Sequence, residues 1–236
     1  MDRAMRMMLA GGVTLLLSGV AFMAYLGYLH NNPPKADGGI VQGATVSGPA
    51  LSIPAFSLMD QDGVAKDRSI LEGRVSVVWF MFTHCKLACP TMSLQMADLQ
   101  RKLKNTGVQF VAFSLDPAHD TPEVLKEYGA KFEVDWRNWT FLTEPSGQAP
   151  KGIGRSIYSH DLKQFVEDAE NDPLTLPDKG TMANILHAVN FFIVGPDGNV
   201  MDKGWYSSKW PQEMEDLRER AIAAQKHFSE KGLLKK

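Results

Sequence analysis

The feature that most constrains the fold is a pair of cysteines between an apolar run and a helical pattern. Cys85 and Cys89 are the only cysteines in the chain. The run that precedes them, 75–83, is rich in β-branched and aromatic residues, which predicts a buried strand. From Pro90 onward, apolar residues recur at helical spacing, which predicts a helix over about 90–104. The two thiols are therefore expected where a strand ends and a helix begins.

This position has chemical consequences for the thiols. The first N–H groups of a helix are unpaired and the helix dipole is positive there, so we expect a lowered thiol pKa and a reactive thiolate. A spacing of four residues puts both sulfurs on one side of the chain, within reach of one metal ion or of each other. A purely structural disulfide is the alternative, but a five-residue ring would stabilise the fold by only about 2 kcal/mol.

Length and charge exclude some classes of function. The chain has 236 residues, of which 44% are hydrophobic and 22% charged, enough for one sizeable core. Its formal net charge is -2 and no basic stripe with interleaved aromatic residues is present. Nucleic-acid binding is therefore not expected.

The amino-terminal region predicts a membrane anchor. Residues 7–29 are uncharged and would span roughly 35 Å as a helix. Arg3 and Arg6 precede this run, so the positive-inside rule places residues 1–6 in the cytoplasm and the remainder outside. A long cleaved signal peptide is the alternative. Residues 30–50, rich in glycine, proline and small side chains, are expected to form a flexible tether.

We expect the protein in a bacterial inner membrane, with its soluble domain facing the periplasm. A mitochondrial inner membrane is the less favoured location, because no long segment rich in arginine and serine precedes the apolar run. Both locations permit disulfides.

Alternating strand and helix patterns over residues 51–236 predict one α/β domain, with a mixed sheet flanked by helices. The acidic stretch 160–180 is expected to be a surface loop or insertion. The other expected elements are a hairpin over 56–66, strands over 108–115, 138–142, 187–194 and 200–205, and helices from Thr121, from about 147 and over 210–227. A thiol pair at the first strand–helix junction is typical of a thioredoxin-like domain.

Three motifs follow one another along the chain. They are Phe82-Thr83-His84-Cys85-Lys86-Leu87-Ala88-Cys89-Pro90, then Ser114-Leu115-Asp116-Pro117-Ala118-His119-Asp120-Thr121-Pro122, then His187 ahead of Phe191-Phe192-Ile193-Val194-Gly195-Pro196-Asp197-Gly198. Together with the apolar amino-terminal segment they resemble the Sco/SenC family of copper chaperones, over roughly residues 54–205. One departure is that the family usually has an acidic residue just before the histidine, where this chain has Leu186 and Asn184.

The resemblance implies a thioredoxin-like fold outside the membrane and copper held by Cys85, Cys89 and His187. It also implies a role in assembling the binuclear copper centre of cytochrome c oxidase. The expected partner is the copper-binding subunit of that oxidase or another copper-accepting protein.

The residue types fit copper chemistry. Thiolates favour Cu(I), and an imidazole accepts Cu(I) or Cu(II). A site with three protein ligands keeps an open side through which the ion can pass on. The alternative function is a thiol-disulfide reductase that keeps the client's cysteines reduced, which would need Cys85 and Cys89 but not His187. A peroxidase is disfavoured, because it would use a single peroxide-reactive thiol.

Other polar residues near the motifs receive plainer interpretations. His84 is expected to point away from the thiol site, and His119 is expected in solvent. Asp116 and Asp120 allow a metal or proton-relay interpretation, but we expect Asp116 and Thr121 to organise a loop and a helix start.

Overall fold

The computed structural model describes residues 52–86, 88–144, 166–176, 178–187, 189–201, 205–206 and 211–235. All of these belong to a compact unit, Val46–Lys236. The expected membrane anchor (7–29), the tether (30–50) and the helix expected from about 147 lie outside the described residues. Within the described ranges, no helix combines the length and apolar character needed to cross a bilayer.

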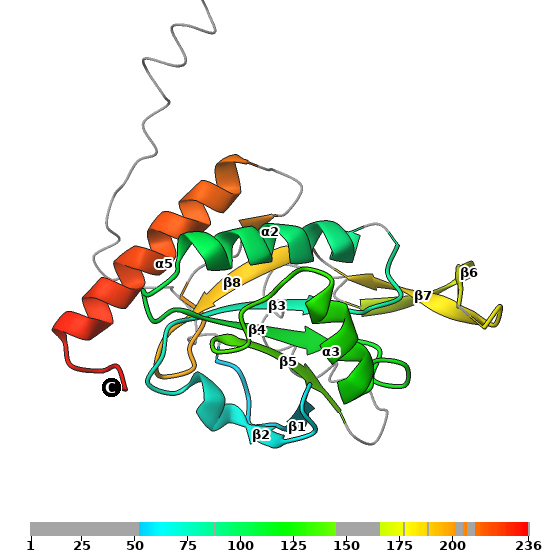
Figure 1. Ribbon diagram of the computed structural model, residues 1–236, viewed down its shortest axis with the longest axis horizontal. Coiled ribbons are helices and arrows are strands. Elements are labelled where there is room, and N and C mark those ends of the chain that lie inside the picture. Colours follow the sequence, from blue (N-terminus) through cyan, green and yellow to red (C-terminus); the bar gives the residue numbers. More distant parts are fainter. Residues whose placement is uncertain are drawn as a thin grey trace, which may run out of the picture. The chain divides into compact units, whose positions relative to one another are not determined.

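A seven-stranded mixed sheet forms the centre of this unit (Figure 1). Its spatial order is β2-β1-β5-β4-β3-β8-β9. The strands are β1 (Ser57–Asp60), β2 (Ala65–Asp67), β3 (Ser76–Met81), β4 (Gln109–Ser114), β5 (Trp139–Thr143), β8 (Asn190–Val194) and β9 (Trp205–Tyr206). β3, β4 and β5 run parallel, whereas β1 and β8 join them antiparallel. The expected mixed sheet and the hairpin near residue 60 are confirmed.

Three α-helices pack on this sheet: α2 (Ala88–Lys102), α3 (Pro122–Ala130) and α5 (Gln212–Glu230), and a short 3-10 helix, η1 (Arg68–Leu71), precedes β3. α3 begins as predicted, since the Thr121 hydroxyl accepts a hydrogen bond from the Val124 N–H. α2 begins two residues earlier than predicted, so Pro90 is its third residue. Proline, which lacks an N–H, is tolerated there, because an N–H in the first turn of a helix would have no intrahelical partner.

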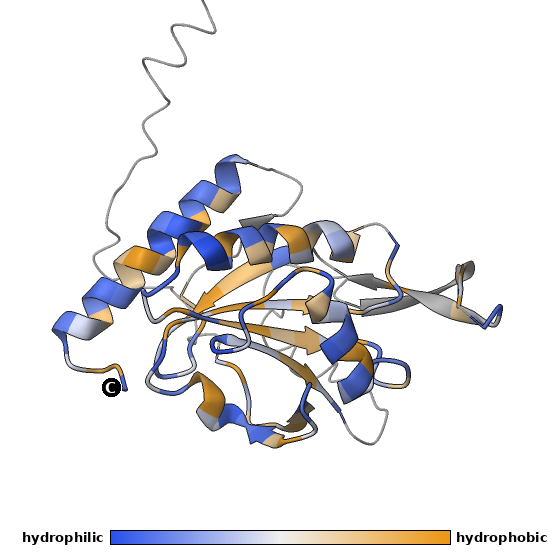
Figure 2. Cartoon of the chain, in the orientation of Figure 1, coloured by the Kyte–Doolittle hydropathy of each residue, from blue (hydrophilic) through white to orange (hydrophobic). Residues whose placement is uncertain are grey.

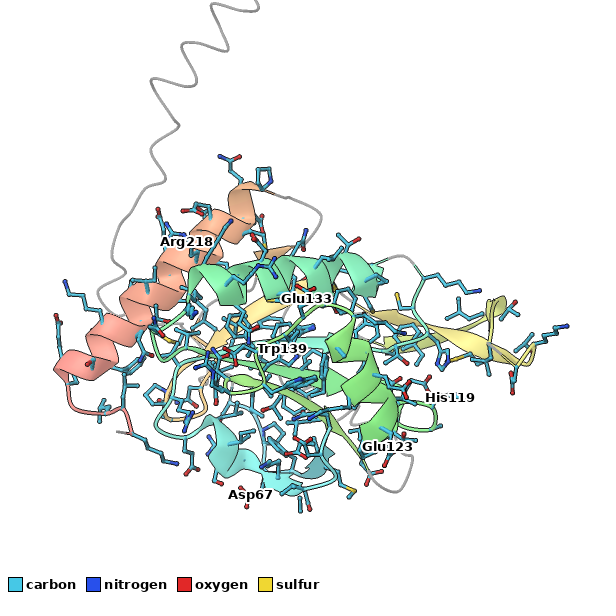
Figure 3. The ribbon with its side chains drawn as sticks, in the orientation of Figure 1. Asp67, His119, Glu123, Glu133, Trp139 and Arg218 are labelled. Atoms are coloured by element: carbon cyan, nitrogen blue, oxygen red, sulfur yellow. The ribbon has the colours of Figure 1, made fainter. Side chains whose placement is uncertain are left out.

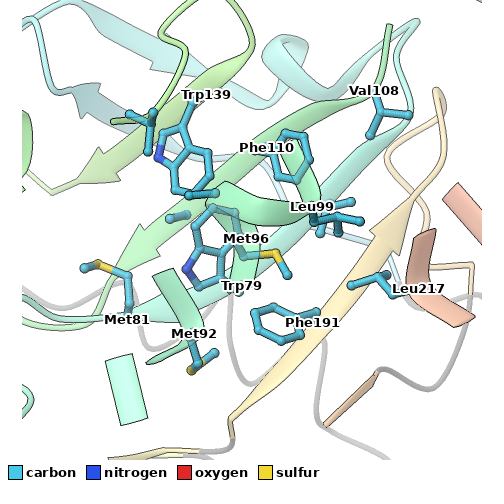
Figure 4. Close-up of a cluster of buried hydrophobic side chains, with 14 of the residues drawn as sticks. Trp79, Met81, Met92, Met96, Leu99, Val108, Phe110, Trp139, Phe191 and Leu217 are labelled. Carbon is cyan, nitrogen blue, oxygen red and sulfur yellow. The ribbon is translucent and has the colours of Figure 1, made fainter. Parts of the chain in front are cut away.

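The sheet separates two buried clusters of apolar side chains. Alternate residues of β3 point to opposite faces, so Val77 and Trp79 join one cluster while Val78 and Phe80 join the other. Residues of all three α-helices contribute to the cluster that contains Trp79 (Figure 4). In Figure 2 the strands of the sheet are mostly hydrophobic, whereas α5 is mostly hydrophilic.

The spacing of apolar residues predicts Met214, Leu217 and Ile222 as the inward face of α5. Met214 and Leu217 are buried, but Ile222 is 37% exposed and Ala221 is buried in its place.

The acidic stretch differs from the prediction. β6 (Val166–Thr175) pairs antiparallel with β7 (Thr181–His187) in a separate two-stranded sheet, drawn in yellow in Figure 1. Residues 166–175 are therefore a strand and not the expected loop, while the alternative of an insertion stays a prediction. Backbone hydrogen bonds hold such a ribbon whatever the polarity of its side chains, so the sequence carried no alternating pattern to reveal it.

The strand predicted over 187–194 is also two elements. His187 is the last residue of β7, and β8 begins at Asn190. The apolar run continues across the break between the two strands, which hid the boundary.

Candidate metal centre

The two cysteines stand where β3 gives way to α2, as predicted. After β3 ends at Met81, the Cys85 N–H donates to the Phe82 carbonyl oxygen at 3.3 Å and closes a tight turn. Cys89 lies in the first turn of α2, and its N–H donates to the Sγ of Cys85 at 3.4 Å. The Cys85 sulfur thus satisfies one of the unpaired N–H groups of the helix start. Both residues are thiols and are not joined in a disulfide.

The environment of Cys89 overturns the expected thiol acidity. Cys89 is fully buried, and burial, with a smaller contribution from the Cys85 side chain, raises the pKa of its thiol well above the ordinary value. The helix start does not lower it, because removing a thiolate from water costs more than the helix dipole returns. Without metal, Cys89 is therefore a protonated thiol at neutral pH, while Cys85 is half-buried.

Strand pairing brings the third predicted ligand to the same end of the sheet. β8 runs antiparallel to β3, with Phe191 opposite Trp79, so the start of β8 lies beside the end of β3. His187 precedes the first residue of β8 by three positions. Its backbone pairs with Val166 in the β6–β7 sheet, but its side chain lies outside what the structure describes. Coordination by His187 therefore stays a prediction.

A buried carboxylate ties the cysteine turn to the neighbouring loop. Asp120 is fully buried and accepts hydrogen bonds from the Thr83 N–H at 3.2 Å, from the Thr83 hydroxyl and from the Ser114 hydroxyl at 2.6 Å. Burial raises the pKa of Asp120 to about 6, although these hydrogen bonds act to lower it. Asp120 thus holds the loop after β4 against the turn after β3, a positioning role that the sequence predicts for Asp116 and Thr121.

The side chains of His84 and His119 both lie beside Asp116, the second carboxylate of that loop. The Nδ1 of His119 lies 2.9 Å from an oxygen of Asp116, and the Nδ1 of His84 lies 3.8 Å from the other. The centroids of the two imidazole rings are 5.3 Å apart. Figure 3 labels His119 on the loop that leads into α3. His119 is expected in solvent, but its side chain is only 35% exposed and contacts Asp116. That His84 points away from the thiol site stays a prediction.

The sequence did contain a signal for this cluster. β3 and β4 are neighbouring parallel strands with Met81 opposite Ser114, so their carboxyl ends lie at one edge of the sheet. The residues that follow two such strands must meet there. The apolar runs predict both strands, whereas the tertiary structure decides that they are neighbours.

The fold and the site define a class: a thioredoxin-like domain with a dithiol at the junction of its first long strand and helix. Comparison with known proteins identifies the family. The SCO1/SenC family model matches residues 44–221 of this chain. The SCO1 protein homolog of Bacillus subtilis is 32% identical over 151 residues, which cover 63% of this chain and 71% of that protein. The chain belongs to the SCO1/SenC family.

Solved structures agree with this assignment. A SCO1/SenC family lipoprotein from Bacillus anthracis is 33% identical with a TM-score of 0.59, over 73% of this chain and 94% of that one. BsSco, a member of the Sco family of cytochrome c oxidase assembly proteins in which a disulfide switch was identified, is 29% identical with a TM-score of 0.59, over 75% of this chain and 95% of that one.

Copper is present in a more distant structure of the family. Bradyrhizobium japonicum ScoI, solved with copper bound, is 22% identical with a TM-score of 0.52, over 71% of this chain and 98% of that one. At this identity the likeness establishes the shared fold. BsSco is described as a member of a family of cytochrome c oxidase assembly proteins. A relative from Stutzerimonas stutzeri, 28% identical over 63% of this chain and 67% of that protein, is named for copper binding.

Proposed function

We propose that this protein is a membrane-anchored copper chaperone. It delivers copper to the binuclear copper centre of cytochrome c oxidase and assists the assembly of that centre. The observation that carries the proposal is the pair of thiols at the first turn of α2, in a chain whose family includes copper-bound members. The client is the copper-binding subunit of the oxidase or another copper-accepting protein.

Cys85, Cys89 and His187 form the proposed ligand set for the copper cargo. The Sγ of Cys85 lies 3.4 Å from the backbone N of Cys89, so the two side chains leave adjacent turns of the chain toward one region. The antiparallel pairing of β8 with β3 supports the third ligand, because it returns the chain near His187 to the end of β3. Two thiolates and one imidazole suit Cu(I) and leave an open side for transfer.

The burial of Cys89 makes metal binding depend on the loss of a thiol proton. A soft metal ion must displace the proton of a thiol whose pKa is raised, so loading releases a proton and the empty site holds one. A protonated, buried thiol also resists oxidation better than an exposed thiolate. The empty protein is thereby kept in the state that accepts copper.

We further propose that residues 7–29 anchor the chain in a bacterial inner membrane and that residues 30–50 extend the domain into the periplasm. The uncharged length of the first segment and the arginines that precede it support this arrangement. A relative described as a lipoprotein is consistent with a membrane-associated family.

The second candidate is a thiol-disulfide reductase that keeps the client's copper-ligand cysteines reduced. The contact of Cys85 Sγ with the Cys89 backbone favours it, because the same closeness lets the pair close into a disulfide. Attack on a client disulfide would oxidise the pair to a disulfide and reduce the client to two thiols. This function would not use His187.

Replacement of His187 separates the two functions. We would titrate the reduced full chain in detergent with Cu(I) without oxygen, for the native protein, His187→Ala and the control His227→Ala, whose histidine is exposed on α5. Stoichiometric reduction of a disulfide-linked model peptide would be measured beside it. We expect His187→Ala to lose at least about tenfold in Cu(I) affinity and to keep its reductase activity.

Unchanged copper affinity in His187→Ala, with disulfide reduction intact, would refute delivery through this ligand set and favour the reductase. Cys85→Ser should abolish both activities. A Cys85→Ser protein that still binds Cu(I) tightly would contradict both functions.

A further inference from the structure

A cluster of metal-ligating side chains lies beside the dithiol and outside its proposed ligand set. We propose that His84, Asp116 and His119 form a second metal site, which takes a divalent ion of the Zn(II) or Cu(II) type. One ligand atom from each of the three residues lies within 4.8 Å of the other two. Among the described residues, no other group of histidines, cysteines and carboxylates converges in this way.

The main evidence for this metal site is the position of His84 beside Asp116. The Nδ1 of His84 is buried and makes no hydrogen bond within the described part of the chain. It lies 3.8 Å from the Oδ2 of Asp116, too far for a hydrogen bond. A metal with ligand bonds of about 2.0–2.1 Å spans such a separation. An ion would therefore satisfy a buried nitrogen that the protein alone leaves unsatisfied.

The remaining contacts complete the site. The Nδ1 of His119 lies 2.9 and 3.0 Å from the two oxygens of Asp116. Without a metal, this short contact is a hydrogen bond between residues three apart in one loop. A metal at this point would replace it with two bonds to the same atoms. His84 and His119 keep partial exposure, which leaves a path for an ion to enter.

The loop that carries the carboxylate is held in place before any ion arrives. Asp116 is 6% exposed, and its N–H donates to the Ser114 hydroxyl at 3.0 Å. Its carbonyl oxygen accepts from the N–H groups of His119 and Asp120. Asp120 in turn binds Thr83, the residue before His84, so both halves of the cluster are tied together. Such outer contacts orient metal ligands and raise affinity.

The ligand types select a different ion from that of the dithiol. Two imidazoles and a carboxylate suit Zn(II) or Cu(II), whereas Cu(I) prefers thiolates. Mg(II) and Ca(II) prefer an all-oxygen environment. Three protein ligands leave at least one position for water or for an exchanging ligand. Because His84 immediately precedes Cys85, an ion held here would lie at the dithiol turn without using either sulfur.

The test uses a background that removes the first site. We would prepare the full chain in detergent with Cys85→Ser, Cys89→Ser and His187→Ala, and titrate it by calorimetry with Zn(II) alone and with Cu(II) alone. We expect about one equivalent bound. Adding His119→Gln should weaken binding at least tenfold, and the matched control His227→Gln should leave it unchanged.

A second measurement locates the ion without further substitution. In the same background, labelled at the histidine side-chain nitrogens, one equivalent of Zn(II) should shift the imidazole resonances of His84 and His119 and leave that of His227 in place. Absence of stoichiometric Zn(II) binding, or binding that leaves these two imidazoles unshifted, would overturn the proposal. Neither result bears on copper binding by the dithiol, which the background lacks.

Discussion

Asp120 should make the stability of the domain fall as pH rises, the reverse of what most carboxylates do. Its side chain is fully buried, and burial raises its pKa from 3.8 to about 6 in the folded protein. The protonated form is therefore favoured by folding. Asp120→Asn places a neutral side chain of the same size at this position and removes the titration.

The sign and size of this pH dependence follow from the raised pKa of Asp120. When a folded-state pKa is raised, the folded state binds more protons between the two pKa values, so the free energy of unfolding decreases with pH across that interval. The contribution of Asp120 is fully present below about pH 4 and is lost as pH rises through 6. A shift of about 2 pKa units corresponds to about 3 kcal/mol at 1.36 kcal/mol per unit.

Urea unfolding of the native chain and Asp120→Asn, in detergent with a chelator, at pH 4, 5, 6 and 7 would measure this effect. We expect the unfolding free energy of the native chain, relative to the variant, to fall by about 2 kcal/mol from pH 4 to pH 7, because part of the roughly 3 kcal/mol is already lost at pH 4. Asp62→Asn is the control, because Asp62 is exposed and its pKa is lowered. A difference between native chain and Asp120→Asn that stays flat or rises with pH would refute the reasoning.

Because the pKa of Cys89 is raised, its thiol stays protonated above pH 8 and must lose that proton when Cu(I) binds. Cu(I) affinity, measured by competition with a chelator, should therefore keep rising above pH 8 by about tenfold per pH unit. A plateau at pH 7 would contradict this. Thr121→Ala should cost about 1 kcal/mol in thermal unfolding, because it removes the cap of α3, whereas Ser229→Ala should cost almost nothing. Gly129→Ala should cost about 1–3 kcal/mol, because its Cβ would overlap the Trp136 ring; a neutral change would show that the ring moves aside.

The geometry also explains why the chemistry gathers at one edge. The central strands β3 and β4 are buried on both faces, so polar groups are admitted only where these strands end. The thiols, Asp120 and the His84 cluster all follow β3 or β4 directly. The start of β8 reaches the same edge from the opposite direction.

The sequence by itself determined the elements that follow local rules. The apolar run before Cys85 predicts a buried strand, because it is rich in β-branched and aromatic residues. The helical spacing after Pro90 predicts the helix face that packs on it. Thr121 with Pro122 defined a helix start, because a side-chain cap acts within three residues. The motifs with Cys85, Cys89 and His187 identified the family. All of these signals lie within about ten residues of the feature that they predict.

Only the tertiary structure decided what depends on residues distant in the chain. Burial by the whole core raised the pKa of Cys89, and no local pattern could report it, because desolvation depends on everything packed around the thiol. The pairing of β6 with β7 and the meeting of His84 with Asp116 and His119 likewise arise between segments that the sequence presents separately. Strand order brings them together, and one-dimensional spacing does not contain strand order.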